Sequence, residues 1–444
     1  MSDYSSSLYH PMIHPNEAEA RESVHITRGD GVYVFDQEGR KLLDGVAGLW
    51  CVNAGHNRPE IKDAIMAQLN ELEYFQLFDG VTHPRVVELA KLLLEFTAEE
   101  NMRRVVFNSG GSDAIETGLK IARQFHRLNG QPERTKFISL KQGYHGTHFG
   151  GMSVNGNNVN RRNYEPLLPG CFHLDSPWLY RNPWTDIPEE LGRLCAEQLE
   201  REIEFQMPDT VAAFIAEPVQ GAGGVIVPPA NYWPLVREVC DRHGVLLMAD
   251  EVVTGFGRSG SMFGSRGWGV KPDIMCFAKG ISSGYIPLGA TMVNERIEQA
   301  FSANENFDGA IMHGYTYAGH PVACAAGIAS LNIVRDENLP ENARVQGDYL
   351  LDALKPLEQF PSVGEVRGKG LMVGIDLVVD KTTREPIDPM GGFAYELGKV
   401  ARREGVLVRP VGTKLILSPP LTFTQSHCDE MVSALNTAFE ELDS

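Results

Sequence analysis

The sequence predicts an α/β fold, with a mostly parallel central sheet flanked by helices and a second, smaller α+β domain. In the middle of the chain, short apolar runs alternate with longer segments of helical periodicity. Those runs are apolar at consecutive positions, which is typical of strands buried on both faces of a parallel sheet. The chain has 444 residues, more than one hydrophobic core usually serves, so we expect two domains.

The elements of the large domain follow one another along the middle of the chain. The pattern predicts strands at 104–107, 137–140, 211–216, 245–249, 274–278 and 288–293. A glycine turn after Phe107 leads into a predicted helix over 113–128. Another helix is predicted over 232–243, where one apolar stripe recurs at helical spacing.

The two ends of the chain differ from the middle and predict the smaller domain. Residues 24–50 alternate like an antiparallel meander with turns at Gly31 and Gly39. Beyond about residue 330 we expect a long helix, a strand at 371–375, a helix at 394–404 and short strands near Val406 and Leu415. The predicted boundaries are 1–59 for the N-terminal part of the small domain, 60–325 for the large domain and 326–444 for the C-terminal part.

Composition limits the classes of partner. The formal net charge of −18 argues against nucleic acid and anionic membranes, because both need a cationic face. The seven cysteines are scattered without a Cys-x-x-Cys pair, which indicates a reducing compartment. The N-terminus is polar, and no run approaches the roughly 18 apolar residues of a membrane span. We therefore expect a soluble, cytoplasmic protein that acts on small molecules.

Polar residues follow the predicted strands at the points where the strands end. Glu217 follows the strand 211–216, Asp250 and Glu251 follow 245–249, and Lys279 follows 274–278. The loop after 137–140 carries Tyr144 and His145. Open α/β sheets bind ligands at the carboxyl ends of their strands. If these strands are neighbours, they direct two carboxylates, an ammonium and an aromatic ring to one place.

The cofactor that these residues predict is pyridoxal phosphate (PLP). The turn 108–112, Asn-Ser-Gly-Gly-Ser, precedes a helix whose N-terminus favours an anion such as phosphate. A lysine can form the Schiff base, an acid can pair with the pyridine nitrogen, and an aromatic ring can stack on the cofactor. The chain has neither a Gly-x-Gly-x-x-Gly fingerprint after a first strand nor a P-loop. His145 and His148 have no third ligand spaced to match, so we predict no metal site.

The chain resembles class III, fold type I PLP-dependent aminotransferases, specifically the ω-amino acid (or amine):pyruvate branch. The resemblance covers almost the whole chain and implies the fold type I architecture. It rests on seven motifs in the family's order: LLDGVAGLWCVNAGH, GSDAIETGLKIAR, GYHG, FIAEPVQGAGGVIVPP, LLMADEVVTGFGRSG, FAKGISSGYIPLGA and HGYTYAGHPVACAA.

The resemblance implies roles for single residues. Lys279 matches the Schiff-base lysine, and Asp250 matches the acid that keeps the pyridine nitrogen protonated. For the cofactor, the matching positions are Gly111 and Ser112 at the phosphate, Tyr144 on the ring, and Thr316, which reaches the phosphate from a partner subunit. For the substrate, they are Trp50, Phe78, Tyr144 and Ala222 in the pocket, and Arg409, which grips a carboxylate. A homodimer is therefore implied, with a tetramer left open.

The resemblance also implies ping-pong transamination from an amine donor to pyruvate. Family members commonly have serine where this chain has Gly110, so one hydroxyl fewer is available near the phosphate. An aminomutase or a decarboxylase would share Lys279 and Asp250, and a non-catalytic PLP-binding protein is a further alternative. An NAD-type oxidoreductase lacks its glycine fingerprint here. The natural donor stays open among β-alanine, 4-aminobutyrate, a polyamine, taurine and arylalkyl amines, with (S) preference implied for chiral amines.

Overall fold

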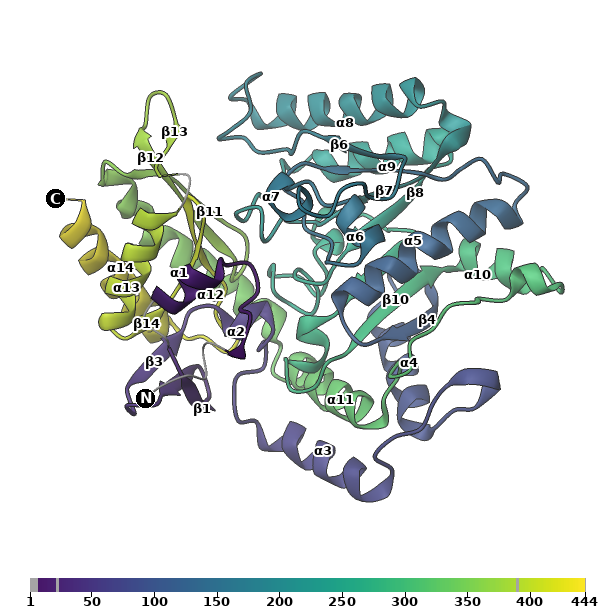
Figure 1. The fold of residues 1–444 in the computed structure, drawn as a ribbon, viewed down its shortest axis with the longest axis horizontal. Coiled ribbons are helices and arrows are strands. Elements are labelled where there is room, and N and C mark those ends of the chain that lie inside the picture. Colours follow the sequence, from purple (N-terminus) through teal and green to yellow (C-terminus); the bar gives the residue numbers. More distant parts are fainter. Residues whose placement is uncertain (1–6, 21–23, 389–390, 444) are drawn as a thin grey trace.

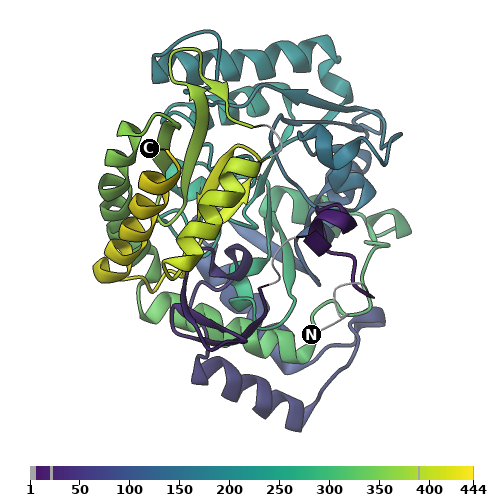
Figure 2. The same ribbon diagram turned by 60° about the vertical axis from the view of Figure 1, so that its left-hand side comes forward.

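A computed structural model describes residues 7–20, 24–388 and 391–443. Figure 1 shows the middle of the chain wound around a large sheet, while the N- and C-terminal segments lie together on the other side of the molecule. Figure 2 shows the same arrangement after a rotation, with the N-terminal strands close to the yellow C-terminal helices. Within the described ranges, no helix combines the length and the apolar character needed to cross a membrane.

The large sheet confirms the predicted α/β class. Its strands lie in the order β4-β10-β9-β8-β7-β5-β6. Their bounds are β4 Met102–Asn108, β5 Lys136–Leu140, β6 Cys171–Leu174, β7 Val211–Ala216, β8 Leu246–Asp250, β9 Ile274–Phe277 and β10 Gly289–Asn294. All neighbours pair in parallel except β10, which is antiparallel to both β4 and β9. The edge strand β6 has no counterpart among the predicted strands.

Helices cover both faces of this sheet, which explains why its strands are apolar at consecutive positions. The helices are α4 (Pro84–Phe96), α5 (Gly111–Leu128), α8 (Pro188–Phe205), α9 (Tyr232–His243), α10 (Glu295–Ser302) and α11 (Pro321–Asp336). In strand β9, Ile274 and Cys276 pack in the core that contains α5. Met275 and Phe277 pack on the opposite face, in the core formed with α4 and α11.

The N-terminal meander forms as predicted but ends earlier. Strands β1 (Ile26–Asp30), β2 (Tyr33–Asp36) and β3 (Lys41–Asp44) pair antiparallel. The prediction that the meander continues to residue 50 is wrong, because a short helical turn, α2 (Ala47–Trp50), follows β3. The Asp44 carboxylate accepts hydrogen bonds from the backbone N–H groups of Val46 and Gly48 and so bends the chain.

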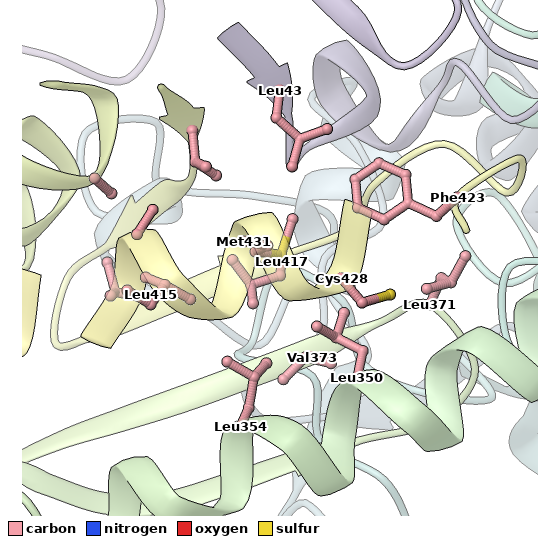
Figure 3. Packing of buried hydrophobic residues seen from close by; sticks show 14 of the residues in the cluster. Leu43, Leu350, Leu354, Leu371, Val373, Leu415, Leu417, Phe423, Cys428 and Met431 are labelled. Carbon is pink, nitrogen blue, oxygen red and sulfur yellow. The ribbon is translucent and has the colours of Figure 1, made fainter. Parts of the chain in front are cut away.

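The C-terminal part forms a second sheet and shares its core with the N-terminal strands. Its elements are α12 (Leu339–Leu354), β11 (Val363–Gly368), β12 (Val373–Asp380), β13 (Glu385–Pro386), α13 (Gly392–Arg403), β14 (Val406–Leu407), β15 (Arg409–Val411), β16 (Lys414–Leu417) and α14 (Gln425–Leu442). Strand β14 pairs in parallel with β3. Figure 3 shows Leu43 of β3 among C-terminal side chains such as Leu417 and Met431.

Four further α-helices lie in the described ranges. They are α1 (Pro15–Ala20), α3 (Pro59–Glu71), α6 (Phe149–Ser153) and α7 (Asn158–Arg161). Helix α11 runs through residue 325, and its side chains enter two cores: Cys324 packs with α4, whereas Ile333 packs with the C-terminal elements. The domain boundaries at 59/60 and 325/326 therefore stay a prediction.

Candidate active site

Four adjacent strands bring the predicted polar residues to one edge of the large sheet. Strands β9, β8, β7 and β5 are consecutive neighbours and run in parallel. Asp250 is the last residue of β8, Glu217 directly follows β7, and Lys279 lies two positions after β9. The loop after β5 carries Tyr144 and His145. The sequence predicted that these side chains would meet if their strands were neighbours. The strand order fulfils that condition.

The carboxylate of Asp250 is held by two hydrogen bonds. The Nδ1 of His145 donates to Oδ2 over 2.8 Å, and the backbone N–H of Val252 donates to Oδ1 over 3.0 Å. Both side chains are almost completely buried, with exposed fractions of 0% for His145 and 3% for Asp250. Each carboxylate oxygen keeps one further lone pair, so the group can still accept a proton donor in a fixed direction.

His145 therefore belongs to the site. The sequence placed it in the loop after 137–140 but gave no role for it. Its spacing to His148 suggested a pair of metal ligands that lacked a third. In the structure the two rings bind different carboxylates, because His148 Nε2 lies 2.6 Å from Oδ1 of Asp113. Only the strand order brings His145 to Asp250, which lies 105 residues later in the chain.

Glu217 joins the loop of Tyr144 to the loop that carries Ala222. Its Oε1 accepts the backbone N–H of Tyr144 at 3.0 Å, and its Oε2 accepts the backbone N–H of Gly221 at 2.9 Å. The side chain is buried, and this burial, together with the nearby Asp250 charge, raises its pKa to about 7. Its contacts fit the role of orienting these two loops.

Glu251 points away from this group, although it directly follows Asp250. Its carboxylate accepts hydrogen bonds from the hydroxyl of Thr254, the backbone N–H of Gly264 and both the N–H and hydroxyl of Ser265. Alternation along the strand turns neighbouring residues to opposite sides. Glu251 therefore fastens the loop 251–265, and Asp250 alone faces the site.

Lys279 stands at the edge of the site without a polar partner. Within the described part of the chain, its amine makes no hydrogen bond or ion pair. The residue is half-buried, and desolvation lowers the pKa of its amine, an effect that the nearby Arg409 charge increases. Cys51, Asp250 and Glu217 act in the opposite direction. A neutral amine is the form that can act as a nucleophile or a base.

The N-terminus of α5 forms a small cradle with the loop after β5. Helix α5 begins at Gly111, and the N–H groups of its first turn have no partner within the helix. The Ser112 hydroxyl accepts the backbone N–H of Thr147 at 3.1 Å. Gly146 has φ +100°, and a Cβ there would lie 2.6 Å from Ser112 Oγ. Only glycine permits this close approach.

Arg409 is a half-buried guanidinium with no anionic partner. Among residues 7–20, 24–388 and 391–443, it makes no ion pair or hydrogen bond. Burial lowers its pKa, which the nearby Tyr144 partly offsets. Burial also raises the pKa of Tyr144. A buried cation without an anion is costly, so this position suits a bound carboxylate.

Trp50 packs beside the turn that carries Ala222. Trp50 is only 3% exposed and packs in a small core with Val219, Val225, Met372 and Ile416. Val219 and Val225 flank the turn that carries Ala222, which is itself half-buried. Trp50 thus packs with the valines on both sides of the Ala222 turn.

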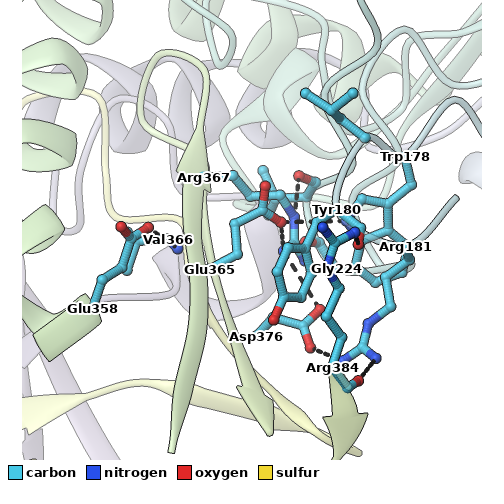
Figure 4. Close-up of polar contacts among 12 residues, drawn as sticks. Trp178, Tyr180, Arg181, Gly224, Glu358, Glu365, Val366, Arg367, Asp376 and Arg384 are labelled. Carbon is cyan, nitrogen blue, oxygen red and sulfur yellow. Dashed lines mark hydrogen bonds and ion pairs between the residues drawn. The ribbon is translucent and has the colours of Figure 1, made fainter. Parts of the chain in front are cut away.

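Arg367 fastens the far end of the same loop. Its guanidinium donates to the carbonyls of Gly224 and Val225, pairs with Glu365 at 2.7 Å, and lies 4.6 Å from the centre of the Trp178 ring. Figure 4 shows this group together with Asp376, which Arg367 reaches at 3.5 Å. The Ala222 loop is therefore held rigidly between the large sheet and the C-terminal sheet.

Phe78 and Thr316 are not part of this cluster. Phe78 is 49% exposed, and a Cβ on Gly314 would lie 3.3 Å from its ring. Thr316 is exposed, and its carbonyl accepts the Tyr74 hydroxyl at 2.7 Å. In the described part of the chain, no hydrogen bond, ion pair or ring contact joins either residue to Lys279 or Asp250. Both residues are exposed instead.

The donor set fits PLP. An α-helix N-terminus offers N–H groups to a phosphate, a fixed buried carboxylate suits a protonated ring nitrogen, and an unpartnered amine is free for a carbonyl carbon. The glycine cradle at Gly111 and Gly146 leaves backbone atoms accessible, and an ideal Cβ on Gly110 would meet nothing within 4 Å. The residues present therefore match the predicted cofactor.

Comparison with known families gives a match along nearly the whole chain. A family model described as class-III aminotransferase matches residues 15–439. A putrescine–pyruvate aminotransferase from Pseudomonas aeruginosa is 40% identical over 94% of this chain and 90% of its own length.

Solved structures match equally fully. An amine transaminase from an uncultivated Pseudomonas species, in its PLP-bound form, is 58% identical with a TM-score of 0.96 and covers 98% of both chains. A thermostable (S)-enantioselective ω-transaminase from Thermomicrobium roseum is 41% identical with a TM-score of 0.95, covering 99% of this chain and 97% of that one.

Proposed function

Because the chain belongs to the class-III aminotransferase family, we propose that it moves an amino group from an ω-amino acid or primary amine to pyruvate. The products are alanine and an aldehyde or ketone. Two similarities support this donor and acceptor: the chain resembles a putrescine–pyruvate aminotransferase and an amine transaminase. The observation that carries the proposal is the unpaired Arg409 guanidinium near Lys279 and Tyr144.

PLP is the cofactor of this family. When bound, it supplies an electron-poor ring that stabilises negative charge on the substrate carbon next to the amino group. In our proposal, Gly111 and Ser112 hold its phosphate, Asp250 pairs with its ring nitrogen and Tyr144 covers the ring. Before the donor arrives, Lys279 would hold it covalently through Nζ.

Lys279 also moves the proton during the reaction. Once the donor amine has replaced it on the cofactor, the released Nζ would take the proton from the substrate carbon that bears the amino group, which requires a neutral amine. Desolvation lowers the pKa of this amine in the required direction. Asp250 stays fixed by His145 and Val252 throughout, so its charge need not reorient as the reaction proceeds.

Arg409 would allow the pocket to accept both substrates with a carboxylate and apolar amines. Its forked donors match both oxygens of a carboxylate such as that of pyruvate. No protein anion holds the side chain in the described ranges, so it can turn aside when an apolar amine enters. Since donor and acceptor use the same Lys279, we infer a ping-pong order in which the first product leaves before pyruvate binds.

We propose (S) preference for chiral amines. The ω-transaminase from Thermomicrobium roseum, described as (S)-enantioselective, supports this preference. The walls that would enforce it are the Trp50 and Ala222 side of the pocket and the Tyr144 side.

A second copy of the chain completes the site in our proposal. Thr316 and Phe78 are exposed in one chain, beside further exposed apolar residues of the same region. These are Phe75, Val81, Ile311, Met312 and Tyr317. Burying such a patch favours association. A homodimer would bring Thr316 of the partner to the phosphate, and two dimers could form a tetramer.

The cysteines support a cytoplasmic location. All seven have free thiols, and Cys195, Cys240, Cys276, Cys324 and Cys428 are buried. Free thiols are typical of proteins in reducing compartments. We therefore propose that the protein works in the cytoplasm.

Kinetics of an Arg409→Met variant test the proposal. With β-alanine or putrescine as donor, the wild type should require pyruvate and release alanine in equal amount. The variant should raise KM for pyruvate by about 10- to 150-fold, since a charge-assisted hydrogen bond contributes about 1.5–3 kcal/mol. The rate at which the variant reacts with putrescine alone should change much less than its KM for pyruvate, because putrescine has no carboxylate. Conversion of an amine without any acceptor would contradict the proposal and indicate an aminomutase or decarboxylase.

A further inference from the structure

The turn 279–283, which carries Lys279, is conformationally strained at both ends. Lys279 has φ +46° and Ser283 has φ +52°, so both lie in the left-handed region without being glycine. Residues with a side chain are disfavoured in this backbone region. A conformation of this kind persists only where neighbouring groups hold it. The residues that hold this turn therefore determine where the Lys279 amine points.

Asn53 and Ala54 contact the turn directly. The backbone N–H of Ala54 donates to the Ser283 hydroxyl at 2.9 Å. The side-chain amide of Asn53 lies so close to Gly280 that a Cβ at residue 280 would clash with its Nδ2. Asn53 is 1% exposed, so this contact is made without water. The amide of Asn53 thus forms one wall of the lysine turn.

Arg258 in turn holds Asn53. Its Nη2 donates to Oδ1 of Asn53 at 2.8 Å, while Nδ2 of Asn53 donates to the Phe256 carbonyl at 3.2 Å. The same guanidinium donates to the carbonyls of Leu371, at 3.1 Å, and Pro419. Both ends of the Asn53 amide are therefore fixed, and Arg258 connects it to two C-terminal segments.

The chemistry of Arg258 is unusual for a structural residue. It is completely buried, and in the described part of the chain it forms no ion pair with a carboxylate. Desolvation lowers its pKa to about 9. Carrying a cation into the interior without an anion is costly. The planar fork of arginine is what reaches acceptors on three separate segments, which a lysine ammonium does not reproduce.

We propose that Arg258, acting through Asn53, is a positioning residue for Lys279: it fixes the strained turn so that Nζ faces the site. The inference rests on the proposed role of Lys279. The proposal also gives a role to the contacts of Arg258 with Leu371 and Pro419. The carbonyls of these two residues fix the guanidinium, and the guanidinium fixes Asn53 beside the turn. Loosening Asn53 would release the turn and misdirect the amine while leaving the α5 cradle intact.

The test compares Asn53→Ala and Arg258→Lys with the wild type and with Arg134→Met. Arg134 is a matched control, because it is also buried and, in the described part of the chain, its guanidinium donates only to carbonyls, of Val211 at 2.9 Å and His243 at 3.1 Å. It lies at the opposite end of β7 from Glu217. Each protein is loaded with PLP. Four quantities are measured: melting temperature, the pH midpoint of the visible cofactor band, the fraction trapped on Lys279 by borohydride, and the rate of reaction with putrescine alone.

We expect all three variants to melt below the wild type. Only Asn53→Ala and Arg258→Lys should shift the midpoint of the cofactor band, and both should slow the putrescine reaction by about 10- to 100-fold, the cost of misplacing a reacting group. If both variants lose only melting temperature, as Arg134→Met does, Arg258 merely stabilises the fold and the inference is wrong. Should Arg258→Lys fail to fold, Asn53→Ala decides alone. Absence of borohydride trapping on Lys279 in the wild type would instead overturn the proposed function.

Discussion

Replacing His145 tests the electrostatic core of the proposed mechanism. His145→Leu removes the donor that holds Oδ2 of Asp250 at 2.8 Å and leaves only the Val252 N–H on that carboxylate. His145→Asn is the matched variant, because the Nδ2 of asparagine can replace the Nδ1 donor of histidine. Both changes shorten or reshape the same buried side chain, but only leucine removes the hydrogen bond.

The magnitude follows from the kind of bond that is lost. A hydrogen bond to a charged group contributes about 1.5–3 kcal/mol, and each 1.4 kcal/mol is a tenfold change in rate. His145 and Asp250 are almost fully buried, so water cannot easily replace the lost donor. We expect His145→Leu to slow the reaction with an amine donor by roughly 10- to 150-fold. His145→Asn should recover most of that loss.

Rapid mixing of PLP-loaded enzyme with putrescine, followed by the change in the visible band, measures this rate. His126→Leu controls for general loss of stability, because His126 is also buried and its Nε2 hydrogen-bonds the Ala212 carbonyl at 2.8 Å. It should lower the melting temperature without changing the rate. If His145→Leu reacts as fast as His145→Asn, the bond between His145 and Asp250 does not contribute to catalysis and this reasoning fails.

Three further predictions concern single residues. Lys279→Ala should abolish turnover while PLP still binds non-covalently, which desalting followed by absorbance measures; near-normal turnover would exclude the lysine. Gly110→Ser should bind PLP about 2- to 10-fold more tightly, the effect of one added hydrogen bond. The site has room, and φ of 178° suits serine; unchanged affinity in equilibrium dialysis would place the hydroxyl elsewhere. Burial raises the pKa of Glu217 from 4.5 to about 7, so the folded state binds more protons and stability falls as pH rises through this window. Melting curves of Glu217→Gln should lack this contribution, and an identical pH dependence would refute it.

The parts of the site that the sequence revealed are those with a local signal. Lys279, Asp250 and Glu217 each follow a run of apolar residues, so their position at a strand end could be read directly. The strand order then brought them together, as expected for neighbouring parallel strands. The apolar character of both faces likewise predicted helices on both sides of the sheet.

Other features depend on contacts between distant residues and have no local signal. The role of His145 depends on its contact with Asp250. The role of Asn53 depends on its contact with Arg258, which lies 205 residues later in the chain. Strand β6 is short and only partly buried, so no apolar run marks it. The antiparallel direction of β10 depends on the connection between β9 and β10. The run of apolar residues in β10 does not indicate the direction of the strand.

The visible spectrum of the PLP-loaded protein, recorded with an amine donor before pyruvate is added, tests the central claim most directly. We predict that β-alanine, putrescine or another primary amine converts the yellow cofactor band. Later addition of pyruvate should restore that band and release one equivalent of alanine per site. A yellow band that no amine converts would contradict transamination, and the absence of any yellow band after PLP is added would contradict the role of Lys279.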